Sequence, residues 1–102
     1  MQYANTFHNM RNFYLIVYDV VNNKRRSKIA RHLEAVGERV QYSVFEVYLN
    51  EKEIKKLEKT LLDIVKKEED SIRFYFLCAT CKTKVKIAGK GALTPAPNVT
   101  IV

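Results

Sequence analysis

At 102 residues, the chain is long enough for one domain and too short for two. Its 18 Lys and Arg against 11 Asp and Glu give a net charge of +7, which favours an acidic partner such as nucleic acid, and its 47% of hydrophobic residues exclude a disordered basic tail. No stretch reaches the roughly 18 apolar residues of a membrane span, and the polar residues 1–9 carry no secretory signal, so we expect a cytoplasmic protein with reduced cysteines.

The first predicted element is a buried strand over residues 13–18, where six apolar residues follow one another. Both alternating sets of side chains are apolar, so both faces of this strand need a cover. Met10 stands just before it, and residues 1–9 are therefore predicted to be a poorly ordered extension. The strand ends at Asp19, whose carboxylate is expected at the sheet edge, next to solvent. Such an aspartate is commonly a turn or cap residue, but there it is also suited to hold a divalent cation.

A helix is predicted over residues 25–36, where apolar residues recur at helical spacing, and Gly37 is expected to end it as a C-cap. The beginning of this helix is basic, and backbone N–H groups at a helix start favour anions. A run of charge is often no more than a solvated face. Here we favour contacts to phosphate without base readout, made by Arg25, Arg26, Lys28 and Arg31.

Residues 39–49 alternate like a strand, but the alternation changes phase near Ser43. This predicts two short strands joined by a tight corner, in preference to one bulged strand. Asn50 and Glu53 form an Asx version of the capping box at the start of a second helix. The inward side chains of that helix are expected to be Ile54, Leu57, Leu61, Leu62 and Val65.

A charged loop at residues 67–70 leads to a last strand over residues 72–78. The order strand, helix, strand, strand, helix, strand is that of an α+β, ferredoxin-like βαββαβ domain, placed here at residues 10–82. Its helices leave one sheet face uncovered, and a twofold copy of the chain is the simplest cover for that apolar face. Residues 83–102 cannot form a core and are expected to add edge strands that pack across this dimer.

Four segments resemble a known family, the CRISPR-associated endoribonucleases that are the smaller of the two universal CRISPR adaptation proteins. The resemblance covers residues 13 to about 78, and its most specific part is the Arg-Val-Gln-x-Ser-Val-Phe-Glu pattern after Gly37. The segments that carry it are YLIVYDV at 14–20, KRR at 24–26, GERVQYSVFE at 37–46 and EDSIRFY at 69–75. The tail matches only in general character.

The resemblance implies a homodimer in which the Asp19 side chains of the two subunits face each other and hold Mg²⁺ or Mn²⁺. It implies a metal-dependent nuclease acting on single-stranded RNA or double-stranded DNA, and a protein that bridges two dimers of the CRISPR integrase during spacer acquisition. By position, Arg26, Lys28 and Arg39 fall where basic residues contact phosphate. Two further positions, Ser43 and Phe45, fall at a corner close to the active site.

Three functions are therefore weighed. The first is a metal-dependent phosphodiesterase that cuts RNA or DNA, and the second is a non-catalytic bridge between integrase subunits and DNA. They differ at Asp19, because only cleavage needs its carboxylate. The third is a generic ferredoxin-like RNA-binding module, which predicts a monomer with aromatic residues on an exposed sheet. The apolar second face and the lack of an RNP-like motif disfavour it.

Several other residues have two interpretations. No general base accompanies Asp19, and neither His8 nor His32 is assigned that role. Cys78 and Cys81 are expected to be inert thiols, the alternative being half of a zinc site that a second copy completes. Three aromatic residues could stack on bases but are expected in the core or an interface; they are Tyr42, Phe45 and Tyr48.

Overall fold

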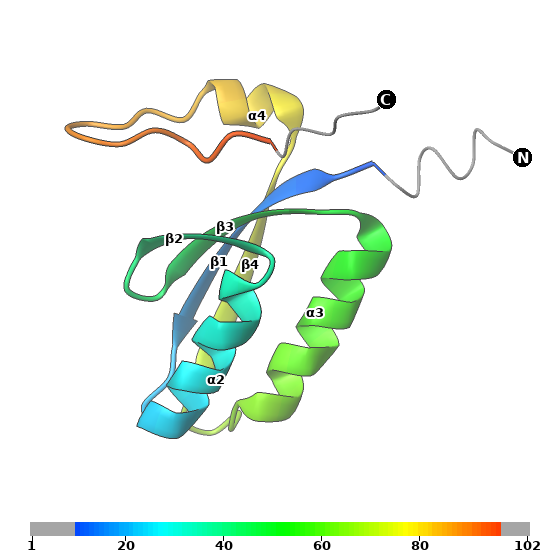
Figure 1. Cartoon of the computed structure of the whole chain (residues 1–102), viewed down its shortest axis with the longest axis vertical. Coiled ribbons are helices and arrows are strands. Elements are labelled where there is room, and N and C mark those ends of the chain that lie inside the picture. The colour runs from blue at the N-terminus through cyan, green and yellow to red at the C-terminus, as the bar shows by residue number, and fades with distance from the viewer. Residues whose placement is uncertain (1–9, 97–102) are drawn as a thin grey trace, which may run out of the picture.

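The computed structural model describes residues 10–96, so the expected extension at residues 1–9 and the last tail residues, 97–102, lie outside the described part. Within it, four strands and three helices follow one another (Figure 1). In chain order they are β1 (Asn12–Asp19), α2 (Asn23–Glu34), β2 (Gly37–Gln41), β3 (Val44–Leu49), α3 (Glu51–Ile64), β4 (Ser71–Leu77) and α4 (Ala79–Thr83).

The strands form one antiparallel sheet in the order β2-β3-β1-β4, and α2 and α3 lie side by side on one face of it (Figure 1). This arrangement confirms the predicted α+β, ferredoxin-like fold. We call the opposite side of the sheet, away from α2 and α3, the open face. None of the helices described here is long and apolar enough to cross a membrane.

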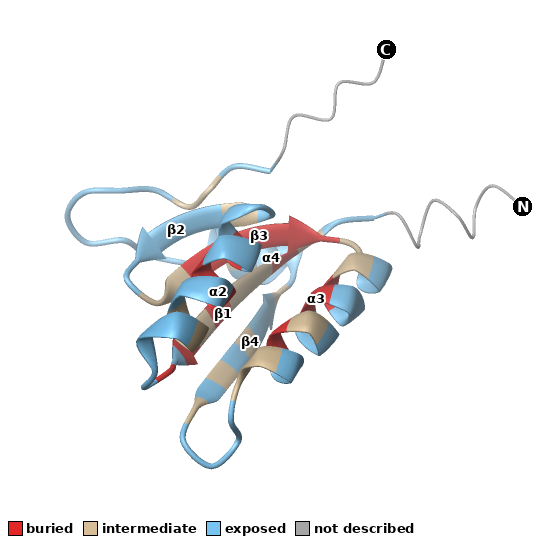
Figure 2. Cartoon of the chain, turned by 60° about the horizontal axis from the view of Figure 1, so that its bottom comes forward, coloured by how far each residue is buried: buried red, intermediate tan, exposed pale blue. Residues whose placement is uncertain are grey.

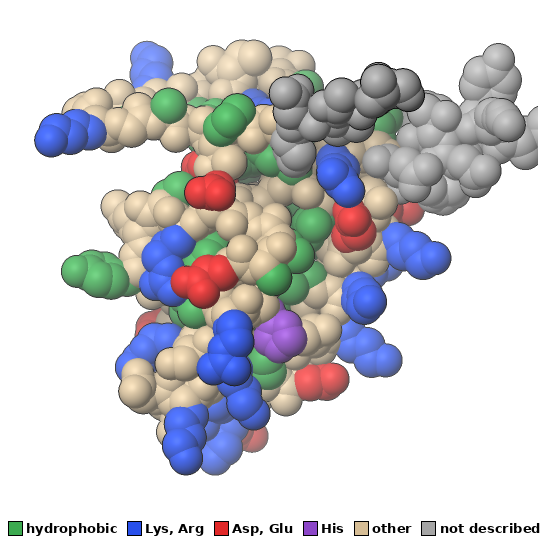
Figure 3. Space-filling model, viewed as in Figure 1, with side chains coloured by type: hydrophobic (Ala, Val, Ile, Leu, Met, Phe, Trp, Pro, Cys, Tyr) green, Lys and Arg blue, Asp and Glu red, His purple; other side chains and the backbone are tan. Residues whose placement is uncertain are grey.

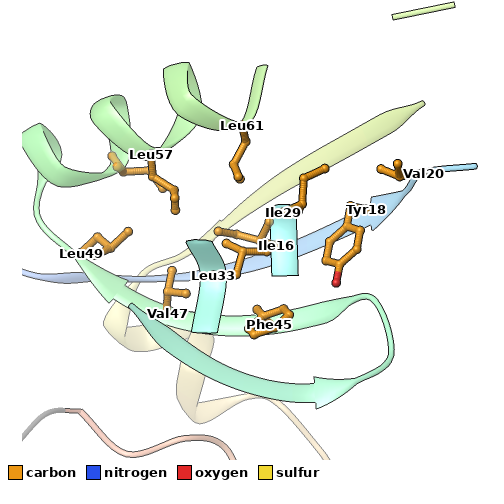
Figure 4. Packing of buried hydrophobic residues seen from close by; sticks show 11 residues of the cluster. Ile16, Tyr18, Val20, Ile29, Leu33, Phe45, Val47, Leu49, Leu57 and Leu61 are labelled. Atoms are coloured by element: carbon orange, nitrogen blue, oxygen red, sulfur yellow. The ribbon is translucent and has the colours of Figure 1, made fainter. Parts of the chain in front are cut away.

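The hydrophobic core lies between the sheet and the two helices, where buried residues gather (Figure 2). Ile16 of β1 and Phe45 of β3 meet Leu33 of α2 and Leu61 of α3, and all four side chains are fully buried (Figure 4). Because side chains alternate along a strand, Ile16 and Tyr18 face the helices while Leu15 and the other odd-numbered residues of β1 face the open face.

Gly37 does not end α2 as a C-cap, contrary to expectation. The helix ends at Glu34, and Gly37 is the first residue of β2, where its φ is not positive. A Cβ at this position would overlap the Val47 side chain and lie 2.5 Å from the carbonyl oxygen of Glu46. The glycine is needed because β2 passes very close to β3 there, and that contact is not visible in the local sequence.

The strand corner and the second cap are confirmed. β2 and β3 are separate strands joined at Tyr42 and Ser43, and their register also shifts between Arg39 and Gln41. The Asn50 side chain accepts from the Glu53 N–H at 2.8 Å and the Glu53 side chain accepts from the Asn50 N–H at 2.9 Å, which completes the capping box.

One inward residue of α3 was wrongly assigned. Leu62 is 47% exposed, whereas Leu61 beside it is fully buried. Successive residues of an α-helix are about 100° apart, since a turn takes about 3.6 residues, so these two neighbours cannot both face the core. The spacing of Ile54, Leu57 and Leu61 already defines the buried face.

The tail lies on the open face of its own sheet. Tyr48 donates to the Thr94 carbonyl oxygen at 3.0 Å, and the Thr94 N–H and hydroxyl donate to the Glu46 carboxylate at 2.9 and 2.7 Å. The short helix α4 was not predicted, and residues 84–96 form no strand within the single chain. Side chains of the sheet face, instead of a sheet edge, bond the polar groups of Thr94. Packing of the tail across a dimer stays a prediction.

Candidate metal and nucleic-acid site

Asp19 is the last residue of β1 and pairs with Ser71, the first residue of β4. Its side chain is exposed and, by alternation, lies on the same side of the sheet as Val17, at the end of the open face. With respect to residues 10–96, its carboxylate makes no hydrogen bond or ion pair. Both oxygens are therefore free to accept a ligand from solvent. The exposure at the strand end is as predicted, and metal binding stays a prediction.

The half of the open face nearest Asp19 is only half covered, and it is apolar apart from Arg73, which pairs with Val17 and donates to the Tyr75 hydroxyl at 3.2 Å. The tail protects the far half, where Phe13 is 2% and Tyr48 is 8% exposed and the Lys82 ammonium lies 4.4 Å from the centre of the Tyr48 ring. In the near half, Tyr75 is 44% exposed. The partly exposed apolar side chains there are Leu15, Val17, Val44 and Tyr75.

Tyr18, which sequence reasoning left unassigned, attaches the β2–β3 corner to the end of β1. Its N–H donates to the Ser43 carbonyl oxygen at 3.0 Å and its hydroxyl to the Tyr42 carbonyl oxygen at 3.3 Å. Burial raises the pKa of the Tyr18 phenol, an effect that the Arg39 guanidinium opposes. Ser43 thus lies beside Tyr18, the residue before Asp19. Phe45 is fully buried and stacks on the Tyr18 ring at 6.3 Å between ring centres, so it supports the corner from the core.

Two of the predicted phosphate-binding residues lie at the Asp19 end of the molecule. Arg26 donates to the Val20 carbonyl oxygen at 2.7 Å, one residue after Asp19. Arg39 donates to the Tyr42 carbonyl oxygen at 2.8 Å and lies over the Phe45 ring at 5.1 Å. Arg39 also pairs with Glu34 at 3.2 Å, and Arg26 also donates to the Asn23 side chain at 3.0 Å. This end of the sheet therefore combines a free carboxylate with two cations that are fixed within the fold.

Lys28 and Arg31 occupy a different surface. With His32 they line a shallow cleft of about 460 Å³ between α2 and α3, whose other wall includes Thr60 and Asp63. Lysine and arginine side chains gather over both helices on this side (Figure 3). Asp19 lies on the open face, so the structure separates Lys28 and Arg31 from it, although all three were predicted for one nucleic-acid site.

Arg25 is engaged within the fold. Its guanidinium donates to Asp70 at 2.8 Å and to Glu69 at 3.0 Å, and only 16% of its side chain is exposed. The Asp70 side chain is fully covered and also accepts the N–H groups of Val21 and Lys66, at 3.1 and 2.9 Å. Sequence reasoning placed Asp70 in a charged loop and missed this role. A hydrogen bond from Arg25, with the two backbone donors, lowers the pKa of Asp70 to about 2.

The depressed pKa of Asp70 makes an acid-sensitivity prediction. A carboxyl group whose folded pKa lies below its unfolded value, about 3.9, stabilises the fold above that value and loses this contribution as pH falls toward about 2. We expect the free energy of unfolding, measured with urea between pH 6 and pH 2.5, to fall more steeply in the wild type than in Asp70→Asn. Glu68→Gln, an exposed neighbour in the same loop, should keep the wild-type slope. Equal slopes in the wild type and Asp70→Asn would contradict the role given to this carboxylate.

Cys78 and Cys81 lie at the start of α4, at the end of the sheet opposite Asp19. Both thiols are free and exposed, and the Cys81 N–H, 3.4 Å from the Cys78 sulfur, holds the pKa of Cys78 below its ordinary value. Within residues 10–96, no group of three or more His, Cys, Asp or Glu side chains is placed to hold a metal. A metal at either position would therefore need water or a second copy of the chain to complete its ligands.

The donor chemistry at Asp19 fits Mg²⁺ or Mn²⁺ better than a softer metal. A free, solvent-facing carboxylate is a hard oxygen ligand, and Mg²⁺ keeps several waters, so one or two carboxylates suffice. Two copies of Asp19 facing each other would supply two carboxylates.

Comparisons with known proteins all point to one group. Residues 10–85 match the family described as CRISPR associated protein Cas2. The CRISPR-associated endoribonuclease Cas2 3 of Synechocystis sp. is 46% identical over 89 residues, which cover 87% of this chain and 97% of that protein. The CRISPR-associated endoribonuclease Cas2 1 of Chloroflexus aurantiacus is 45% identical over 80 residues, covering 78% and 86%.

Solved structures of Cas2 proteins have a similar fold. Streptococcus pyogenes Cas2 superimposes with a TM-score of 0.68 at 33% identity, covering 76% of this chain and 99% of that one. A chain of a partial Cas6-RT-Cas1–Cas2 complex superimposes with a TM-score of 0.69 at 36% identity, covering 87% and 99%. The family match includes β1 and β4, the two strands that place Asp19.

Proposed function

Because the chain belongs to the CRISPR-associated Cas2 family, we propose that it is a metal-dependent endonuclease that cleaves phosphodiester bonds of single-stranded RNA or double-stranded DNA and takes part in spacer acquisition. The observation that carries the proposal is the free, exposed carboxylate of Asp19 at the end of a buried strand, with Arg26 bonded to the next residue and Arg39 fixed at the same end of the sheet. The relatives from Synechocystis and Chloroflexus, both named endoribonucleases, support the cleavage activity.

In this proposal, Asp19 binds Mg²⁺ or Mn²⁺ together with the Asp19 of a second subunit. The metal would polarise a phosphoryl oxygen and lower the pKa of a bound water. Arg26 and Arg39 would hold the phosphate beside the carboxylates, and their anchored guanidinium groups lose little freedom on binding. Lys28 and Arg31, on the helix side, would extend the contact along the nucleic-acid backbone.

A homodimer is the first requirement of this proposal. Tyr75 lies in the uncovered half of the open face and is 44% exposed, and Leu62 on α3 is exposed to a similar extent, 47%. We expect the wild type and Leu62→Glu to sediment as dimers at micromolar concentration, and Tyr75→Glu to dissociate because it places a charge in an apolar interface. An ordered wild-type monomer would contradict the dimer, and a dimeric Tyr75→Glu would move it to another surface.

A second function, a non-catalytic bridge, is supported by one comparison. A chain of a complex that contains Cas1 shares this fold at 36% identity, which favours an integrase as the protein partner. A bridge needs the dimer and the basic surfaces but not the Asp19 carboxylate. The third function, a generic RNA-binding module, has less support, since Phe13 and Tyr48 of the open face are nearly buried under the tail.

Both favoured functions predict nucleic-acid binding that depends steeply on salt and little on sequence. Six to ten phosphate contacts per dimer would lower the affinity by about 10³- to 10⁵-fold between 50 and 200 mM salt, because bound counterions are released. Fluorescence anisotropy with labelled RNA and duplex DNA measures this. Lys28→Ala with Arg31→Ala should make the slope of log K against log salt shallower, whereas Lys90→Ala, an exposed tail residue, should leave it unchanged. An affinity that does not change with salt concentration, or no binding to either RNA or DNA, would contradict the phosphate contacts.

A further inference from the structure

The peptide group that joins Val20 to Val21 is held by charged side chains on both sides. Arg26 donates to its carbonyl oxygen at 2.7 Å, and its N–H donates to the Asp70 carboxylate at 3.1 Å. This peptide begins one residue after Asp19. The backbone before Asp19 is fixed by the β1 ladder, in which Asp19 itself pairs with Ser71. The direction in which the chain leaves Asp19 therefore depends on these two contacts and on the buried Val20 side chain.

Asp70 has no capacity left for a ligand of its own. One oxygen accepts the Val21 N–H, and the other accepts the Lys66 N–H at 2.9 Å and the Arg25 Nε–H at 2.8 Å. A second nitrogen of Arg25 lies 3.3 Å from Asp70 and 3.0 Å from Glu69. The Asp70 side chain is fully covered, so solvent and substrate do not reach it. We call these five residues, Val21, Arg25, Lys66, Glu69 and Asp70, the Asp70 network.

We propose that Asp70 and Arg25 are positioning residues for the Asp19 carboxylate: they hold the segment after Asp19 so that its oxygens meet the metal in the required geometry. The inference rests on the proposed metal-dependent activity. Mg²⁺ demands nearly octahedral ligands, and hydrogen-bonded groups behind a metal ligand set its orientation. The Asp70 network also ties the loop after β1 to the loop before β4, and these two loops flank the Asp19–Ser71 pair.

The test measures metal affinity in Asp70→Asn. The substitution keeps the size of the side chain, but its NH₂ group would face Arg25 together with the N–H of either Val21 or Lys66, donor against donor. We expect the Mn²⁺ concentration for half-maximal cleavage, and the Mn²⁺ dissociation constant from electron paramagnetic resonance, to rise about 10- to 100-fold. The rate at saturating Mn²⁺ should fall less. Arg25→Lys keeps the positive charge but loses the planar guanidinium that bonds Asp70 through two nitrogens. Its increase in the Mn²⁺ dissociation constant should be smaller than that of Asp70→Asn. Glu68→Gln removes one charge from the same loop and should bind Mn²⁺ like the wild type.

Every variant is assayed well below its own unfolding temperature, so that a general loss of stability leaves the metal dependence unchanged. If Asp70→Asn does not fold, Arg25→Lys carries the test. Wild-type affinity in the folded variant would overturn the positioning role while the proposed function stands. If the wild type and Asp19→Asn bind Mn²⁺ equally, or neither binds it, the proposed function fails and the positioning role with it. Weaker binding in Asp70→Asn and Arg25→Lys, but not in Glu68→Gln, supports the inference.

Discussion

Asp19→Asn is expected to abolish Mg²⁺- or Mn²⁺-dependent cleavage of RNA and DNA. The amide keeps the size and much of the hydrogen bonding of the side chain but removes the charge that holds a hard divalent cation. Changes in groups behind a metal ligand typically cost about 10- to 100-fold, so loss of the ligand itself should exceed about 100-fold. The assay compares purified wild type and variant with Mg²⁺, Mn²⁺ and EDTA.

The same substitution should leave the rest of the molecule in place. Because Asp19 is exposed and its carboxylate bonds to none of residues 10–96, the variant should dimerise and bind DNA with the wild-type salt dependence. The metal-free dimer should even gain stability, since two facing carboxylates repel each other. Glu58→Gln, an exposed residue of α3, serves as the control for the change in charge. Cleavage that survives, with contaminating nuclease excluded, removes Asp19 from the mechanism. Unchanged spacer acquisition in Asp19→Asn would instead assign the biological role to the bridge.

Gly37→Ala is expected to destabilise the fold strongly. The added methyl group would overlap Val47 and approach the Glu46 carbonyl oxygen to 2.5 Å, so β2 must move away from β3. Overpacking of this kind typically costs about 1–3 kcal/mol, and here a backbone atom, which cannot rotate away, is part of the conflict. Urea unfolding followed by circular dichroism measures the loss.

The control for that change is Glu38→Ala, which alters the next, exposed residue of the same strand and should be nearly neutral. Gly37→Ala is also predicted to weaken phosphate binding, because β2 carries Arg39. If Gly37→Ala is as stable as the wild type, the two strands can move apart at little cost. The close approach of β2 to β3 would then not explain why residue 37 is a glycine.

Local patterns predicted local structure well. The capping box at Asn50 and Glu53 needs only residues three apart, and the end of β1 at Asp19 follows from an uninterrupted apolar run. The strand corner at Ser43 was visible as a change of phase in the alternation. These features depend on neighbours in the sequence, and the structure confirms them.

What the sequence did not predict depends on contacts between distant segments. Asp70 meets Arg25 and Val21 across 45 and 49 residues, and no spacing rule distinguishes this aspartate from the other acids of its loop. The reason for Gly37 is likewise a contact with β3. The tail lies on Glu46 and Tyr48 because those side chains face away from the helices, which only the assembled sheet determines.

The separation of the basic residues has the same origin. Arg25, Arg26, Lys28 and Arg31 follow each other on one helix, and the sequence suggested one phosphate-binding surface. A helix turns each residue by about 100°. Arg26 therefore meets the end of β1, Arg25 meets Asp70, and the other two face the cleft beside α3. Of the basic residues predicted to bind phosphate, only Arg26 and Arg39 therefore lie at the Asp19 end of the sheet, and hydrogen bonds to backbone carbonyl groups fix both of them.

The most direct test of the central claim is the number of Mn²⁺ ions bound per chain at the Asp19 site. Titration of the wild-type dimer, followed by electron paramagnetic resonance, should give one tightly bound Mn²⁺ for every two chains, and Asp19→Asn should lose it. This ratio is expected because, in the proposed dimer, two carboxylates, one from each subunit, would share one metal. Equal Mn²⁺ binding by the wild type and Asp19→Asn, or no binding by either, would contradict the account.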